Sequence, residues 1–181
     1  ASDVYKRQGG GAVASNTALG ISALSSNSTG TYNTAIGASA LTASTGNWNT
    51  AVGRAALNAT TGSDNTAVGG NSLLSTTTGT DNSALGAFSL QSNLSGSYNT
   101  AIGSSALINN TTANYNTAVG YQSLYSNTTN NSSTAVGYQA AYAATGAQDA
   151  FGYLALKNDA TGYYNVAIGN RALTTNNGGT Y

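Results

Sequence analysis

The sequence predicts a parallel β-solenoid of about ten coils, on the basis of three observations. A phrase of the form Asn-Thr-Ala-(Val/Ile/Leu)-Gly recurs at spacings of 15–17 residues. A second glycine or another turn former stands between most successive phrases, and a leucine follows nearly every phrase at a fixed distance. A fixed short period indicates one structural unit stacked on copies of itself. The glycines that close the phrases are Gly20, Gly37, Gly53, Gly69, Gly86, Gly103, Gly120, Gly137, Gly152 and Gly169.

The residues just before each phrase-closing glycine are expected to form a short strand. Alanine stands two positions before the glycine in all ten repeats, and threonine usually stands three positions before it. Threonine and β-branched aliphatic residues favour strands. The residue one position before the glycine is large and apolar, and we call this series the aliphatic column: Leu19, Ile36, Val52, Val68, Leu85, Ile102, Val119, Val136, Phe151 and Ile168.

Each repeat is expected to hold a second short strand-like piece, on a sheet that faces the first, and two corners that return the chain to the same place. Leucine stands four positions after the phrase-closing glycine in nine repeats, with Ala141 in the tenth. Glycine and asparagine at the corners permit positive φ angles. A helix is disfavoured, because each interior glycine costs about 1 kcal/mol relative to alanine. Ten coils spaced as strands in a sheet predict a rod roughly 45–50 Å long.

Two orientations of the strands are possible, because successive side chains point to opposite faces. We expect the aliphatic column and the leucine column to fill the core, with the alanine column, and the Ala/Ser column three positions after each glycine, facing outward. The alternative orientation buries Asn, Ala and Gly in a thinner coil and exposes a Thr-x-Val face. In either case the asparagines that open the phrases, such as Asn33 and Asn116, are expected to form a hydrogen-bonded ladder.

The repeat resembles known fibre proteins. Phrases such as Asn-Thr-Ala-Val-Gly-Tyr-Gln-Ser-Leu-Tyr-Ser-Asn-Thr-Thr over residues 116–129 resemble arrays in phage tail fibres and adhesin-like proteins. The Ala-x-Gly-x-x-Ala core is similar to the heads of trimeric autotransporter adhesins, which are homotrimeric β-rolls with a shorter repeat. The resemblance covers residues 12–181, and it implies an extracellular, virion or cell-surface location, self-association as a trimer or lateral filament, and an adhesive role.

Residues 12–181 are predicted to form a single solenoid domain, and residues 1–11 a leader outside the repeat. That leader is either native or a translated sequencing adaptor, which residues 3–8 resemble. Because Tyr181 stops where the next phrase would begin, we expect the chain to be part of a longer array.

Composition argues against several classes of function. Charged residues make up 6% of the chain and the net charge is zero, so nucleic-acid binding is disfavoured. Apolar runs are too short to span a membrane. Without histidine or cysteine the usual catalytic bases, thiols and metal ligands are missing, so we expect no enzyme activity, no cofactor and no metal. Asp64 and Asp81 occupy equivalent positions in adjacent repeats, and a Ca²⁺ site there is the less favoured alternative to two solvated corner residues.

Two series of residues are candidate binding positions. Tyr121, Tyr138 and Tyr153 each follow a phrase-closing glycine, and their rings are expected either to stack on sugars or, as we prefer, to stack on one another. The second series is a threonine column of short, identical side chains: Thr34, Thr50, Thr66, Thr100, Thr117 and Thr134. The first functional hypothesis is a structural and adhesive fibre segment whose partners are copies of itself or glycans. The alternative is an ice-binding solenoid, similar to repeats in some cold-water algae, in which the threonine column orders water.

Overall fold

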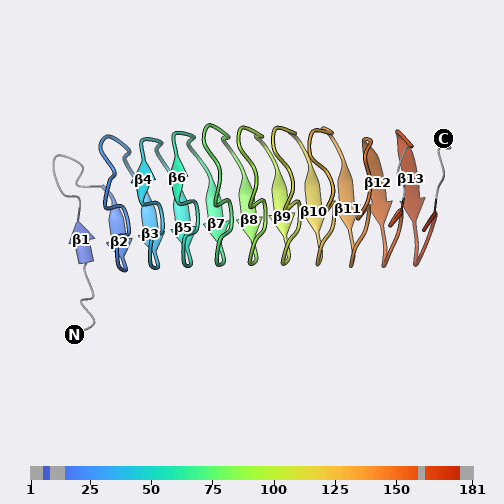
Figure 1. The fold of residues 1–181 in the computed structure, drawn as a ribbon, viewed down its shortest axis with the longest axis horizontal. Coiled ribbons are helices and arrows are strands. Elements are labelled where there is room, and N and C mark those ends of the chain that lie inside the picture. Colours follow the sequence, from blue (N-terminus) through green and yellow to red (C-terminus); the bar gives the residue numbers. More distant parts are fainter. Residues whose placement is uncertain (1–5, 9–14, 159–161, 176–181) are drawn as a thin grey trace.

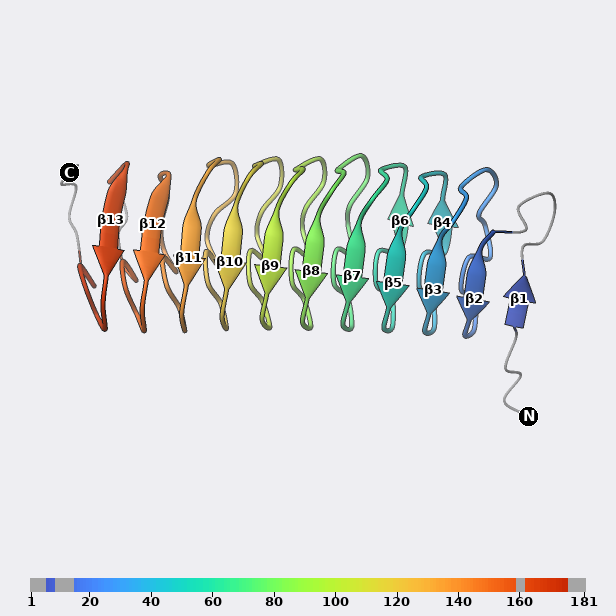
Figure 2. The ribbon, with the colours of Figure 1, turned by 180° about the vertical axis from the view of Figure 1, so that it is seen from behind.

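The computed structural model describes residues 6–8, 15–158 and 162–175, and in these residues the only regular secondary structure is the β-strand. The predicted β-solenoid is confirmed: short strands follow one another along a straight rod, with one strand of the main sheet in each described coil (Figures 1 and 2). The second strand expected in every repeat is wrong for most described coils, because only two of them hold one and the leucines lie in turns. The strands are β1 (Lys6–Gln8), β2 (Thr17–Leu19), β3 (Thr34–Ile36), β4 (Ala43–Ser44), β5 (Thr50–Val52), β6 (Ala59–Thr60), β7 (Thr66–Val68), β8 (Ser83–Leu85), β9 (Thr100–Ile102), β10 (Thr117–Val119), β11 (Thr134–Val136), β12 (Gln148–Phe151) and β13 (Asn165–Ile168).

The main sheet runs the length of the rod. It holds eleven strands in the order β1-β2-β3-β5-β7-β8-β9-β10-β11-β12-β13, and β4 and β6 form a separate two-stranded sheet. All neighbours from β2 to β13 pair in parallel, as expected when each coil returns to its starting point, whereas β1 pairs with β2 antiparallel. The predicted leader therefore contributes one described strand, and the rest of residues 1–11 lies outside the described residues.

The register of the sheet places equivalent residues of the repeat beside one another. Thr17 lies beside Thr34, Ala18 beside Ala35 and Leu19 beside Ile36, and the same match continues from strand to strand. It continues even where a repeat is only 15 residues long, since Val136 lies beside Phe151. Each column of the sequence is consequently a physical ladder along the rod.

The preferred orientation of the strands is wrong, and the alternative orientation holds. The alanines of the strands are buried, whereas the aliphatic column points outward, with Ile36 37% and Ile102 40% exposed. The leucine column is buried as predicted, up to Leu156, and the Ala/Ser column that was expected outside is buried with it.

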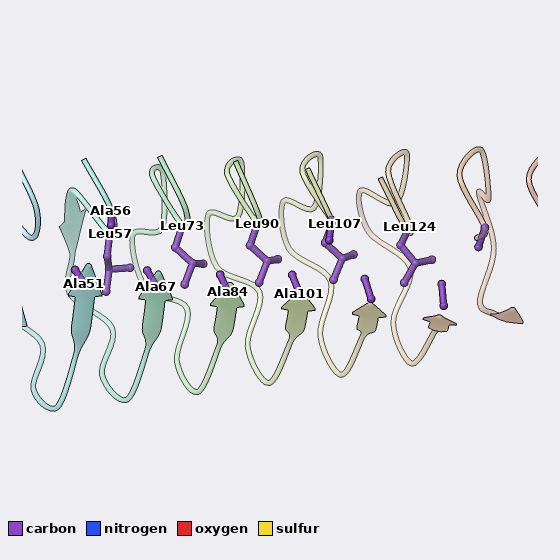
Figure 3. Packing of buried hydrophobic residues seen from close by; sticks show 14 of the residues in the cluster. Ala51, Ala56, Leu57, Ala67, Leu73, Ala84, Leu90, Ala101, Leu107 and Leu124 are labelled. Carbon is purple, nitrogen blue, oxygen red and sulfur yellow. The ribbon is translucent and has the colours of Figure 1, made fainter. Parts of the chain in front are cut away.

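The physical reason is the thickness of the coil. Each leucine reaches the interior from the turn that follows the glycine and faces the strand alanines (Figure 3). Leu107 and Ala101 both have no exposed surface, so a leucine opposite a methyl group already fills the available space. A second large side chain from the strand would overpack this core.

The turn after each strand depends on glycine. Gly86 has a φ of +136°, and a Cβ added to it would lie 2.6 Å from both the carbonyl carbon and the oxygen of Gly103 in the next coil. The buried leucines that follow also have positive φ, for example +51° at Leu107. Residues with positive φ at alternate positions, such as Gly103, Ser105 and Leu107, turn the chain sharply enough to bring the leucine under the strand.

Candidate functional surface

The most extensive candidate surface is the outward side of the main sheet, which we call the threonine–aliphatic face. It consists of the first and third residues of the repeat strands β2, β3, β5, β7 to β11, and their equivalents in β12 and β13. The predicted threonine positions all lie on it, half-buried or exposed: Thr34, Thr50, Thr66, Thr100, Thr117 and Thr134. Thr17 and Ser83 complete that column from β2 to β11, and Asp149 takes the position in β12. From β2 to β11 the face carries no charged side chain.

A ladder of buried asparagines holds each strand of this face in place. Oδ1 of Asn49 accepts a hydrogen bond from the backbone N–H of Asn65 in the next coil at 3.0 Å. Nδ2 of Asn49 donates to the carbonyl of Gly62, also in the next coil, at 2.9 Å. Both ends of the amide are thus satisfied in the interior, which is the condition for burying a polar side chain. The predicted ladder is confirmed, and it fixes the spacing of the strands that follow it.

The ladder changes near the C-terminal part of the rod. Ser133 and Gln148 stand where the other coils have asparagine. Nε2 of Gln148 donates to the Gly162 carbonyl at 2.9 Å, while its Oε1 is buried without a hydrogen-bond partner. Oγ of Ser133 accepts the backbone N–H of Gln148 at 3.2 Å, so a hydroxyl replaces the asparagine amide as the acceptor at this step of the ladder.

A second set of asparagines supports the corner on the far side of several coils. Asn93 and Asn110 are fully buried. Nδ2 of Asn110 donates to Oδ1 of Asn93 at 2.8 Å and to the carbonyl of Ala113 at 3.1 Å. We did not predict this set, although its signal is visible in the sequence as an asparagine seven positions after several phrase-closing glycines.

The predicted tyrosines form a stacked ladder at the end of the strands. The ring centroids of Tyr121 and Tyr138 lie 5.4 Å apart, as do those of Tyr138 and Tyr153, with interplanar angles near 20°. Both faces of the Tyr138 ring are therefore covered by neighbouring rings, which leaves no free face there on which a sugar could stack. The arrangement favours the structural interpretation, in which ring stacking stiffens the rod.

Other aromatic residues pair in the same way. Tyr32 stacks on Trp48 with centroids 4.2 Å apart, and Tyr98 stacks on Tyr115 at 5.1 Å. A further pair, Tyr125 and Tyr142 at 4.7 Å, was missed, although its spacing matches the length of one repeat. The stacking follows directly from the in-register coils, because rings at equivalent positions are one strand spacing apart.

A cleft of about 580 Å³ opens where one repeat is two residues shorter than most others. Asn131 and Ser132 of the preceding coil and Tyr163 and Tyr164 of the following coil line it, with Ala147 between them. Tyr163 and Tyr164 are 51% and 78% exposed. We did not predict this cleft, but the 15-residue spacing between Gly137 and Gly152 was its signal.

The acidic residues that the sequence singled out lie apart from these features. Asp64 and Asp81 are exposed corner residues. Among the described residues, no group of three or more metal-ligating side chains of the His, Cys, Asp and Glu types comes together. In the same part of the chain, no helix has the length and hydropathy needed to cross a membrane.

Comparison with known proteins adds no further constraint. No protein-family model matches the chain, and the curated proteins and solved structures give no significant match.

Proposed function

We propose that the protein is a non-enzymatic structural segment of an extracellular fibre on a virion or cell surface, and that it associates with copies of itself through the threonine–aliphatic face. The single observation that supports this most is the apolar exposure of that face together with the absence of charged side chains on it from β2 to β11. Leu85 is 50% exposed and Ile102 40%, in a column that runs the whole described solenoid. Contiguous exposed apolar surface on a soluble protein usually marks an interaction site.

The rest of the fold suits a stiff spacer. Adjacent coils are joined by strand pairing, by buried asparagine amides and by stacked rings, and all three act along the rod axis. Each coil contacts chiefly its neighbours, so the length of such a rod is set by the number of repeats. A stiff rod of this kind would hold the tip of a fibre at a fixed distance from the virion or cell surface.

The decisive measurement is the oligomeric state. Sedimentation velocity of the chain from about 1 to 100 μM should show concentration-dependent association, and Ile102→Asp should abolish it, because a buried unpaired charge is costly. Leu94→Asp is the matched control: Leu94 is 45% exposed but lies outside the face, so its variant should associate normally. A native chain that stays monomeric over the whole range would refute the proposal.

A second candidate function, ice binding, is favoured by one specific observation. The threonine positions lie side by side in register on the outer side of a parallel sheet. Regularly spaced methyl and hydroxyl groups on such a surface can order water in a lattice. This column is exposed because the alanine of each strand points into the thin coil, so that the residues on either side of it form an outward Thr-x-Val face.

Ice binding is tested by thermal hysteresis and ice shaping. If the face binds ice, Thr100→Tyr should reduce thermal hysteresis, since a bulky ring would hold the ice surface away from neighbouring coils. Thr112→Tyr, at an exposed corner, is the control. Absence of hysteresis and of ice shaping in the native protein would eliminate this candidate and leave the fibre proposal unaffected.

A further inference from the structure

The side chains of the aliphatic column alternate in size with a period of four coils. Along the rod they read as two large, two small, two large, two small and two large residues: Leu19, Ile36, Val52, Val68, Leu85, Ile102, Val119, Val136, Phe151 and Ile168. These positions are not in the core, where leucine and alanine repeat almost without variation. Packing inside the coil therefore gives no reason for the alternation.

The alternation suits a second copy of the same chain. When two sheets pack face to face, large side chains of one sheet fit best over small side chains of the other. A shift of two coils places the large pairs of one rod over the valine pairs of its partner. Only a surface with the same period matches along the whole length, and another copy of this chain has that period.

Symmetry then selects the orientation. A closed dimer has a two-fold axis, and for two facing rods that axis lies in the interface. An axis along the rod sets each coil opposite itself, so that large residues meet large residues. An axis along the strands reverses one rod relative to the other, which allows large residues to meet small ones while the aliphatic columns still face each other.

Two antiparallel registers match the sizes over eight coils, and charge separates them. One register pairs the eight coils whose main-sheet strands are β5 and β7 to β13. It buries Asp149 against the partner's face. The other pairs the coils of β2 to β11, where the face has no charged residue. The second register is favoured. In the first, Asp149, whose Oδ1 accepts the backbone N–H of Thr134 at 3.1 Å, would be a buried charge with no opposite charge on the partner's face, which is costly. The second register places Leu19 opposite Val136, Ile36 opposite Val119, Val52 opposite Ile102 and Val68 opposite Leu85.

We propose that the partner of the threonine–aliphatic face is a second copy in antiparallel orientation, with the two-fold axis between β7 and β8. This inference rests on the proposed self-association and specifies its geometry. Each strand contributes only two outward side chains, so the interface is a narrow strip and the dimer is expected to dissociate on dilution.

A size exchange tests the pairing of Val68 with the partner's Leu85. Val68→Leu would set leucine against leucine and should weaken dimerisation roughly tenfold, as overpacking does in cores. The double variant V68L/L85V exchanges the two sizes and should restore the native dissociation constant. Both side chains lie outside the core, so the fold should be retained, as circular dichroism would show. A double variant no tighter than V68L would overturn the pairing.

Distances between spin labels test the orientation independently. The chain has no cysteine, so single cysteines at the exposed corner positions Thr45, Thr78 and Thr112 can each be labelled alone. The axis between β7 and β8 places position 78 level with its copy, whereas positions 45 and 112 are each displaced from their copies by four coils, roughly 19 Å along the rod. Double electron–electron resonance should therefore give the shortest distance at position 78 and longer, similar distances at the other two.

The outcomes separate this inference from the proposed function. Equal distances at all three positions, in a chain that does associate, would indicate an in-register dimer, a trimer or a uniformly staggered filament, and would overturn the antiparallel dimer alone. A chain that is monomeric at every concentration would overturn both.

Discussion

Oδ1 of Asn82 accepts the backbone N–H of Asn99 at 3.0 Å, and Oδ1 of Asn99 accepts the backbone N–H of Asn116 at the same distance. Each asparagine donates its backbone N–H to Oδ1 of the asparagine in the preceding coil, and its own Oδ1 accepts the backbone N–H of the asparagine in the following coil. Its side chain is fully buried. These hydrogen bonds therefore link successive coils inside the strand side of the core. An ionised carboxylate in this position would accept the same hydrogen bond but could not donate to the Ala113 carbonyl, as Nδ2 of Asn99 does at 2.8 Å.

Asn99→Asp should consequently make stability depend on pH. Burial and the facing carbonyl disfavour the charged carboxylate, so the pKa of the new side chain is raised in the folded state above about 3.9. The folded variant then binds more protons than the unfolded chain, and the free energy of unfolding falls as pH rises through that value. Denaturant unfolding from pH 3 to pH 8 should show the gap to the native protein widening with pH. A gap that narrows with pH would contradict the buried ladder.

Leu107 and Ile102 make a direct test of which side of the strand is inside. Leu107→Asp buries an unpaired charge and should cost about 4 kcal/mol or more, whereas Ile102→Asp stays in solvent in the monomer and should cost less than about 1 kcal/mol. Urea unfolding at a concentration where the chain is monomeric gives both values. Equal losses in the two variants would mean that the aliphatic column is in the core after all.

Gly86 and Gly70 form a matched pair for the backbone argument. Alanine at position 86 meets the Gly103 backbone at 2.6 Å and sits at a positive φ, so Gly86→Ala should lower the free energy of unfolding by at least roughly 2 kcal/mol. A Cβ at Gly70 meets nothing within 4 Å, and Gly70→Ala should change stability by less than about 1 kcal/mol. Comparable destabilisation by both substitutions would show that the close approach of the coils is not what requires glycine.

Tyr138 should contribute more to stability than its neighbour Tyr121, because it stacks on both sides. Each lost stack is expected to cost about 0.5–1.5 kcal/mol, so Tyr138→Ala should cost about twice as much as Tyr121→Ala. Thermal unfolding of the two variants measures the difference. If the two losses were equal, or if Tyr138→Ala abolished binding to a glycan without affecting stability, the ladder would be a ligand platform instead.

The repeat made the fold predictable from the sequence. It did not make predictable which side chains of each strand point into the core. Period and turn residues determine a coil that closes on itself, and in-register stacking then follows for Asn33, Thr34 and every other column. Hydrophobicity alone favoured burying Ile36 over Ala35, and it failed because the space inside a coil of this length is already filled by Leu41. That leucine adopts a φ of +44°, which no propensity scale anticipates for such a residue. The threonine column was identified from the sequence, but its exposure depends on this packing. The cleft beside Gln148 results from a repeat two residues shorter than most others, and the repeat spacing alone does not say where in the coil the space opens.

Shortening the array distinguishes a repeated face from a local site. Because each coil adds one equivalent strand and one pair of outward side chains, chains ending at Gly137, Gly120 and Gly103 should lose unfolding free energy in similar steps. Removal of the residues after Gly137 deletes β12, β13, the Tyr163–Tyr164 wall of the cleft and two rings of the tyrosine ladder, Tyr138 and Tyr153. It keeps the eight main-sheet strands from β2 to β11 that we assign to the interface. Self-association should therefore survive that first truncation and weaken progressively in the next two, with circular dichroism confirming the fold of each chain and sedimentation reporting the dissociation constant. Complete loss of association on the first truncation, in a chain that still folds, would place the interaction at the cleft and the end of the tyrosine ladder, and the model of a repeated face would be wrong.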